Sequence, residues 1–284
     1  NCWIGAKVEQ EGAITVPARL LADLVSSLPS GQIELELISQ TKTLNLKTGR
    51  FEANIKGIDA QEFPLILLPE ENDRVNLDAN LLRQMIDQVV LAASTDESRP
   101  VLTGVLVNLA PDSLMLAAAD GYRCSIRSVA LEGGPQGPMS IIIPARALQE
   151  LRRISGEEEA TVEMLVAPQR NQVFFHMKDA DLVSQLVEGT FPDVKQIIPS
   201  TWNTKTTVNT LDFLKAVQTA FIFARDSANV VSLQVVPNES PGTGRLIVTG
   251  SSSEHGDNVG ELDVTVEGAP IEMAFDARYF IDLL

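Results

Sequence analysis

The chain has 284 residues, of which 44% are hydrophobic, and it carries a formal net charge of −16. No apolar run approaches the ~20 residues of a membrane-spanning helix, so we expect no membrane partner, and a chain of this length can bury a large core. A charge this negative argues against attraction to nucleic acid. The two cysteines argue against a disulfide framework and for a reducing, cytoplasmic location.

The first predicted elements are a short strand and an amphipathic helix. Residues 14–16 form an apolar run, and Pro17 introduces a helix expected over 18–28. Proline suits a first helical turn because its missing N–H would have no partner there. The alternating pattern then predicts strands at 33–37, 44–46 and 51–55, followed by Phe63-Pro64 and a polar linker at 68–73.

The middle of the chain holds a longer series of predicted elements. A helix over 80–94 precedes strands at 101–109, 114–118 and 123–130, and Asp120-Gly121 predicts a hairpin turn. The strand-into-helix motif then returns as an apolar run at 141–143, Pro144 and a helix over 145–155. The series closes with strands at 160–166, 172–178 and 181–187, then Phe191-Pro192 and a second linker at 199–204.

The last predicted elements repeat this order. They are a helix over 213–225, strands near 230–236, 244–249 and 259–266, an apolar run at 271–275 and a helix over 277–284. Asp276 takes the place of the proline that introduces the earlier two helices. Its carboxylate can cap the first N–H groups of the helix, so the residue changes while its effect on the backbone is kept.

The spacing of the motif predicts the domain organisation. Arg19, Arg146 and Arg278 follow one another at 127 and 132 residues, and the two Phe-Pro pairs lie 128 apart. A period near 130 residues is typical of tandem domains. We therefore predict an α+β fold of three tandem similar domains, each with two helices against antiparallel sheet. The expected domains are 1–72, 73–204 and 205–284, the first and last incomplete.

The two ends of the chain fit this interpretation. The chain opens Asn1-Cys2-Trp3 without a methionine or a basic signal sequence, and it ends inside a predicted helix. Three periods would need about 390 residues. We therefore expect a fragment that lacks about 100 residues, split between the two ends.

Catalytic residues are scarce in the sequence. His176 and His255 do not stand at metal-ligand spacing from each other or from a cysteine, and each is expected in an ordinary strand or loop. Gly242-Thr243-Gly244 lacks the rest of a phosphate-binding fingerprint, so we expect a turn there. We predict no enzyme, no cofactor and no metal.

Positive charge gathers on the predicted helices. They hold eight basic and four acidic residues, a net +4, which leaves −20 for the rest of the chain. The basic residues are Arg19, Arg83, Arg146, Arg152, Arg153, Lys215, Arg225 and Arg278. In the middle helix Leu148 and Leu151 share one side and the arginines the other. These are candidates for a DNA-facing surface, and solvated helix faces of no special use are the alternative.

Four motifs in order resemble one known family. They are Arg99 to Leu106, Ala119-Asp120-Gly121-Tyr122-Arg123, Ile143-Pro144-Ala145-Arg146 and Glu188 to Asp193. This arrangement resembles the beta subunit of bacterial DNA polymerase III, the sliding clamp family. The resemblance implies three similar domains per chain and a homodimeric ring around duplex DNA. It also implies that basic helices line the hole and that the ring tethers the polymerase without catalysis.

The resemblance also implies a pocket for short linear peptides from DNA polymerase III and the clamp loader. The matching positions are Leu102, Gly121, Tyr122, Arg123, Cys124, Pro192, Gln196 and Ile197. Cys124 stands where the family usually has leucine, and Gln196 where an arginine is common. The alternative is plain structure, with Leu102 and Ile197 in a core and Arg123 in a surface ion pair.

A dimer contact is expected from the helix over 213–225. Three large apolar residues, 221–223, follow one another there at 100° steps, so one must point away from the helix's own sheet. In the family the third domain of one chain meets the first domain of the other. The candidates are therefore Ile222 or Phe223 against the strand around Ala53 and Ile55.

Two other kinds of protein stay open at this stage. One is a repeat-domain interaction scaffold that never encircles DNA. The other is a hydrolase whose active site lies in the acidic loops. The scarcity of histidine and the lack of metal-ligand spacing argue against a hydrolase.

Overall fold

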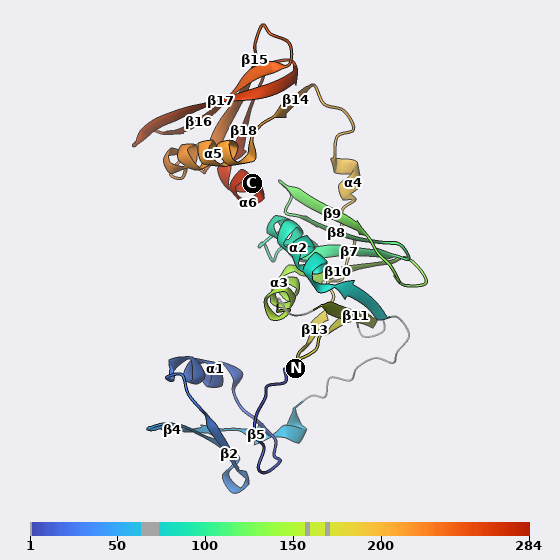
Figure 1. Ribbon diagram of the computed structural model, residues 1–284, viewed down its shortest axis with the longest axis vertical. Coiled ribbons are helices and arrows are strands. Elements are labelled where there is room, and N and C mark those ends of the chain that lie inside the picture. The colour runs from blue at the N-terminus through green and yellow to red at the C-terminus, as the bar shows by residue number, and fades with distance from the viewer. Residues whose placement is uncertain (1, 64–73, 157–159, 168–170) are drawn as a thin grey trace. The chain divides into compact units, whose positions relative to one another are not determined.

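The computed structural model describes residues 2–63, 74–156, 160–167 and 171–284 (Figure 1). Residues 2–63 belong to one compact unit and residues 74–284 to another. The linker expected at 68–73 lies outside the described residues. None of the helices in these ranges is long and apolar enough to cross a membrane.

Within residues 2–63 the first unit contains one α-helix and five strands. Strand β1 (Ile14–Thr15) pairs antiparallel with β5 (Ile58–Asp59), and helix α1 (Ala18–Ser27) follows β1. Strands β2 (Glu34–Ile38), β3 (Thr43–Thr48) and β4 (Phe51–Lys56) form an antiparallel sheet in that order. Asn45 on β3 donates from Nδ2 to Glu52 and Asn54 on β4, at 2.8 and 2.9 Å, and these bonds satisfy a buried amide.

Two four-stranded antiparallel sheets form most of the second unit's first part, which we call the middle domain (residues 74–197 as described). One sheet has the order β10-β7-β8-β9, with β7 Gly104–Ala110, β8 Ser113–Ala119, β9 Cys124–Ala130 and β10 Met139–Pro144. The other has the order β13-β12-β11-β6, with β6 Arg74–Asp78, β11 Thr161–Ala167, β12 Gln172–His176 and β13 Asp181–Gln185. The α-helices of the middle domain are α2 (Ala79–Val89), α3 (Ala145–Ile154) and the short α4 (Val194–Ile197).

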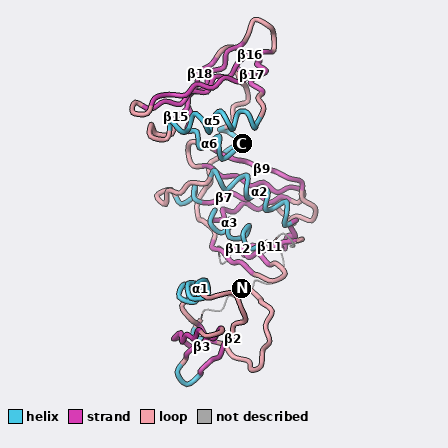
Figure 2. Tube along the Cα trace, turned by 60° about the vertical axis from the view of Figure 1, so that its left-hand side comes forward, coloured by secondary structure: helices cyan, strands magenta, loops and turns pink. Residues whose placement is uncertain are grey.

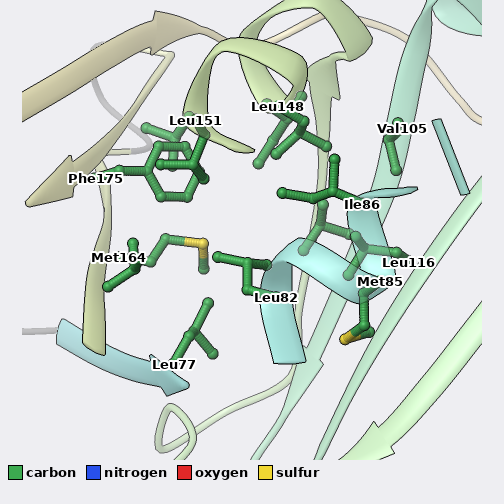
Figure 3. Close-up of a cluster of buried hydrophobic side chains, with 14 of the residues drawn as sticks. Leu77, Leu82, Met85, Ile86, Val105, Leu116, Leu148, Leu151, Met164 and Phe175 are labelled. Carbon is green, nitrogen blue, oxygen red and sulfur yellow. The ribbon is translucent and has the colours of Figure 1, made fainter. Parts of the chain in front are cut away.

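Helices α2 and α3 share one core with both sheets. Leu82, Met85, Ile86 and Val89 stand at helical spacing on α2 and are all buried. Leu148 and Leu151 of α3 face the same cluster, which Leu77, Met164 and Phe175 of the second sheet complete (Figure 3). The apolar stripe of each helix therefore decides which face it turns inward and leaves its arginines outside.

The third domain (residues 204–284) is a five-stranded antiparallel sheet with two helices. The sheet order is β14-β17-β16-β15-β18, with β14 Thr204–Thr207, β15 Val230–Pro237, β16 Thr243–Ser252, β17 Gly256–Gly268 and β18 Ile271–Asp276. Helix α5 (Thr210–Ala224) runs along the sheet (Figure 2) and meets α6 (Ala277–Leu283) through an edge-to-face contact of Phe213 with Phe280. A Cβ on Gly250 of β16 would overlap the backbone of Ala220, so α5 approaches this strand closely.

The predicted α+β fold with repeated strand-into-helix motifs is confirmed, with local corrections. Pro17 and Pro144 occupy the N-cap position, one residue before the first turn in which they were expected. Asp276 caps α6 by accepting from the backbone N–H of Arg278 at 2.9 Å, as expected. The helix expected over 80–94 ends at Val89 and continues as a 3₁₀ turn over residues 90–92.

Other elements differ from the sequence prediction for physical reasons. Residues 100–103 form a 3₁₀ turn that Pro100 starts, so β7 begins only at Gly104. Strands β6 and β14 were missed because both are short and largely polar. Helix α5 begins at Thr210, three residues early, because Asn209 caps it by accepting from two backbone N–H groups.

Candidate functional site

The pocket positions suggested by the sequence lie on three segments that meet over one face of the sheet β10-β7-β8-β9. Alternate residues of a strand point to opposite faces, so Ala117 and Ala119 of β8 lie away from the main core. Phe191 and Val194 cover them in a second buried cluster, with Val101 packed against it. The segments around Leu102 and Pro192 are thus held on the same surface.

Two glycines show how closely these segments approach. Gly121 has φ +99°, and a Cβ there would lie 2.9 Å from Nη1 of Arg99. Gly189 has φ +132°, and its Cβ would lie 2.6 Å from Cγ2 of Val101. Both backbone conformations favour glycine. The segment containing Arg99 and Val101 therefore touches both the turn 120–123 and the segment that leads into α4.

The side chains at these positions differ in exposure. Leu102 is half-buried, whereas Cys124, Pro192 and Gln196 are exposed. Tyr122 is 84% and Ile197 59% exposed, so Ile197 is no core residue in this structure. The surface therefore offers apolar groups to a partner, as the pocket interpretation requires, although binding of a peptide here stays a prediction.

The turn 120–123 is built by Asp120. Its Oδ1 accepts from the backbone N–H groups of Tyr122 and Arg123 at 2.8 and 3.0 Å, which is a turn closed by an aspartate side chain. The hairpin turn expected at Asp120-Gly121 is confirmed. Arg123 is engaged as well, since it donates to Asp120 and to Asp282 of the third domain. It therefore forms ion pairs, which is the structural alternative left open by the sequence.

A hollow of about 540 Å³ lies beside these positions. It has both apolar and polar lining residues: Leu106, Asn108, Met115, Ser140, Ile141, Ile142, Asn171, Leu186, Val187, Gly189, Thr190, Phe191, Pro192, Asp193, Val194 and Lys195. Pro192 is its only residue in common with the predicted pocket. Sequence reasoning missed this hollow, because it depends on how the segment 186–195 crosses the sheet.

Several basic residues of the helices are already paired. Arg152 of α3 donates two N–H···O hydrogen bonds of 2.8 and 3.2 Å to Asp87 of α2, and these bonds to the carboxylate raise the pKa of Arg152 above its ordinary value. Arg153 pairs with Glu150 at 2.8 Å, and Arg278 bonds Asp276. These three charges are partly neutralised by neighbouring carboxylates, and contact of these helices with DNA stays a prediction.

Arg83 has a different function in the fold. It donates to the backbone carbonyl groups of Ser155 and Gly156, just beyond the end of α3, and to the side chain of Asn80. A cation at a helix C-terminus satisfies carbonyl groups that the helix leaves without partners. Arg83 therefore stabilises the end of α3, and its charge is directed at that helix.

Four of the eight basic residues remain open in the described part of the chain. Arg19, Arg146, Lys215 and Arg225 are exposed, and none has an ion-pair partner within the described residues. We call these four the open cations. Since α5 starts at Thr210, Asp212 also belongs to that helix and reduces the basic excess that the sequence predicted.

The expected dimer-contact residues divide into exposed and buried ones. Ile222 is 57% exposed and Phe223 is half-buried, so Ile222 is the outward residue of the run 221–223. On the first unit Ala53 is half-buried, whereas Ile55 is only 4% exposed. Ile55, which like Ala53 lies on β4, turns its side chain inward, and the dimer contact around these two residues stays a prediction.

Metal-ligating clusters are absent from the residues that the structure describes, counted as three or more His, Cys, Asp or Glu side chains. His176 lies exposed on β12 with its Nδ1 2.6 Å from Asp181 Oδ1, and His255 lies in the turn between β16 and β17. Both histidines have the ordinary strand and loop positions that the sequence predicted.

Sequence comparison supports one family along the whole chain. Models of the N-terminal, central and C-terminal domains of the DNA polymerase III beta subunit match residues 3–68, 76–193 and 195–284. The beta sliding clamp of Bacillus subtilis is 32% identical over 279 residues, which is 98% of this chain and 72% of that protein. The beta sliding clamp of Staphylococcus aureus strain N315 is 30% identical over 279 residues, 98% of this chain and 71% of that protein.

Solved structures agree with this result. The DNA polymerase sliding clamp from Bacillus subtilis superposes with a TM-score of 0.86 at 30% identity, covering 98% of this chain and 71% of that one. The DNA polymerase III beta subunit from Thermotoga maritima gives a TM-score of 0.84 at 25% identity, with 98% and 73% covered. The chain belongs to the DNA polymerase III beta subunit, or beta sliding clamp, family.

Proposed function

We propose that this chain forms part of a ring that encircles duplex DNA and tethers the replicative DNA polymerase III. The observation that carries the proposal is the match of all three clamp domain models along one chain. The beta clamp family provides processivity and has no catalytic activity, in accord with the lack of a catalytic constellation in the sequence. Retention on DNA is then topological, and it requires no cofactor.

The charge distribution supports this function. Contacts from lysine and arginine to phosphate are electrostatic and independent of base sequence, which a sliding ring requires. The open cations Arg19, Arg146, Lys215 and Arg225 are the candidates for such contacts. The remaining chain is strongly acidic, and this charge would discourage DNA from binding elsewhere on the protein.

A homodimer is the proposed assembly of the ring. Exposed Ile222 on the third domain is the candidate anchor against the β4 edge of the first domain of a second copy. Exchange of Ile222 for Asp should shift the dimer toward monomer in sedimentation experiments, because a buried apolar contact would become a charged one. Exchange of Val259 for Asp, an exposed apolar residue on β17, provides a control in a different part of the third domain.

The proposed protein partners are DNA polymerase III and the clamp loader, which would bind the exposed groups around Leu102, Tyr122, Pro192 and Ile197 through short peptides. The proposed location is the cytoplasm, in association with the nucleoid. The partner proposal rests on family membership and on the exposed apolar groups at these positions, and the proposed location rests on family membership.

A retention assay tests the central proposal. The protein is loaded onto nicked circular duplex DNA and onto the same DNA after linearisation, and retention is measured after a wash in high salt. A clamp stays on the circle and leaves the linear molecule by its ends. Equal retention on both, or loss from both at the same salt, would identify a scaffold that does not encircle DNA.

A further inference from the structure

A compact charged cluster joins the middle domain to the third domain. The middle domain contributes Asp120 and Arg123 from the turn 120–123, and helix α6 and its N-cap contribute Asp276, Arg278, Tyr279 and Asp282. Two cations thus stand against three carboxylates, with one aromatic ring among them. Nothing in the spacing of the sequence indicates this cluster, because Arg123 and Asp282 are 159 residues apart.

Arg123 is the centre of the cluster. Its Nη1 lies 2.7 Å from Oδ2 of Asp282, and its Nε lies 3.1 Å from Oδ2 of Asp120. The guanidinium carbon lies 4.6 Å from the centre of the Tyr279 ring. One side chain therefore combines two charge-assisted hydrogen bonds with a cation–π contact, and two of the three partners belong to the other domain.

The surroundings make these contacts stronger than those of an exposed pair. The Arg123 side chain is only 22% exposed. Burial acts to lower the pKa of its guanidinium, and the hydrogen bonds to Asp282 and Asp120 more than offset this, so the pKa is raised. Burial likewise raises the pKa of Tyr279, and the neighbouring carboxylates act in the same direction. Both groups keep the protonation state that the contact needs at neutral pH.

The turn also orients Arg123 before it meets the third domain. Asp120 holds the backbone N–H and the Nε of Arg123 at the same time. This leaves the face of the guanidinium and its Nη1 directed at α6. Lysine would not replace arginine here, because a point charge cannot stack on a ring and bind two carboxylates with one planar group.

We propose that Arg123 is an interdomain clasp, a positioning residue that holds helix α6 of the third domain on the turn 120–123 of the middle domain. The clasp sets the orientation of the third domain. This inference goes beyond the proposed function, since it requires neither DNA nor a peptide to be bound.

Distance measurements between two spin labels test the clasp. The labels are attached at exposed positions in the two domains, Glu132→Cys and Ser240→Cys, in a chain whose native cysteines are replaced by serine. Double electron–electron resonance should give one narrow distance distribution for the parent chain. Arg123→Ala and Arg123→Lys should both broaden it, and Asp282→Asn should broaden it from the other side of the contact.

The matched control is Arg152→Ala, which removes an arginine–aspartate pair confined to the middle domain. It should leave the distribution narrow. The double variant with Arg123→Ala and Asp282→Asn should be no broader than Arg123→Ala alone, because the first exchange already removes the contact with Asp282. A parent-like distribution in Arg123→Ala and Asp282→Asn, with circular dichroism showing a folded chain, would overturn the proposal, and so would full rescue by lysine.

Discussion

Replacement of Arg146 by Gln should remove one phosphate contact from the proposed DNA surface. Arg146 is exposed on α3 and is one of the open cations, so its charge is available to a phosphate. Each phosphate contact contributes about −0.9 to the slope of a plot of the logarithm of the association constant against the logarithm of salt concentration. Loss of one contact should weaken binding by about 0.9 log units at 0.1 M salt, roughly eightfold, or about 1.2 kcal/mol.

The matched control lies on the same helix. Arg152 is bonded to Asp87 through two contacts, so the double exchange of Arg152 to Gln and Asp87 to Asn removes the pair without changing the net charge. This variant should keep the salt dependence of the parent. Single exchange of Arg152 is a poorer control, because it leaves the carboxylate of Asp87 without its partner.

Fluorescence anisotropy with a short labelled duplex measures the effect, since a linear fragment separates phosphate attraction from topological retention. Titrations between about 50 and 200 mM salt cover the range in which such contacts change affinity strongly. The reasoning is refuted if Arg146→Gln leaves the slope unchanged, or if the net-neutral double variant lowers it equally.

Three further predictions concern stability and peptide binding. Gly250→Ala should lower the urea midpoint of unfolding, because its Cβ would overlap the backbone of α5. Gly260→Ala should change the midpoint little, since the nearest atom lies 3.8 Å from its Cβ. Equal midpoints for the two variants would contradict the close approach of α5 to Gly250. Leu102→Ala or Pro192→Ala should cost about 1–3 kcal/mol in binding of a polymerase-derived peptide, measured by calorimetry, and wild-type affinity for both would disprove the pocket. The hydrogen bonds from Arg278 lower the pKa of Asp276 in the folded protein. The ionised carboxylate therefore stabilises the fold at pH values above its ordinary pKa of 3.8, and this stabilisation is lost as pH falls through the lowered pKa of the folded state. Asp276→Asn should therefore reduce the urea midpoint at pH 7, and the difference from the parent should shrink as pH falls through the lowered pKa of Asp276. A difference that stays constant with pH would refute this.

Repeated local patterns explain why most of the fold could be predicted. Each strand-into-helix motif can be recognised by itself, because its signals lie within a few residues of one another. These signals are an apolar run and the N-cap residue that follows it, which is Pro17, Pro144 or Asp276. Strand β6 was missed for the opposite reason. Its two buried residues, Val75 and Leu77, are too few for a pattern, and pairing with β11, far along the chain, makes it a strand.

The candidate site was less predictable because its electrostatics depends on distant pairs. Arg152 and Asp87 stand 65 residues apart, and no local rule shows that the carboxylate would neutralise the arginine. The resemblance to a family located Arg123 correctly in a turn, yet its contacts with Tyr279 and Asp282 require the packed third domain. The composition gives the number of charged residues, whereas the fold determines which of them are free of an ion pair and so available to a phosphate.

The short connection between α4 and β14 has a consequence for the strength that the clasp needs. Helix α4 ends at Ile197 and β14 begins at Thr204, so six residues, 198–203, join two anchored elements. Fully extended, they reach about 20 Å. Reclosure after opening is then an intramolecular event at an effective concentration in the millimolar range. A contact whose dissociation constant between separate molecules were only about 1 mM would still be closed about half of the time, so even a weak clasp can govern the orientation of the third domain.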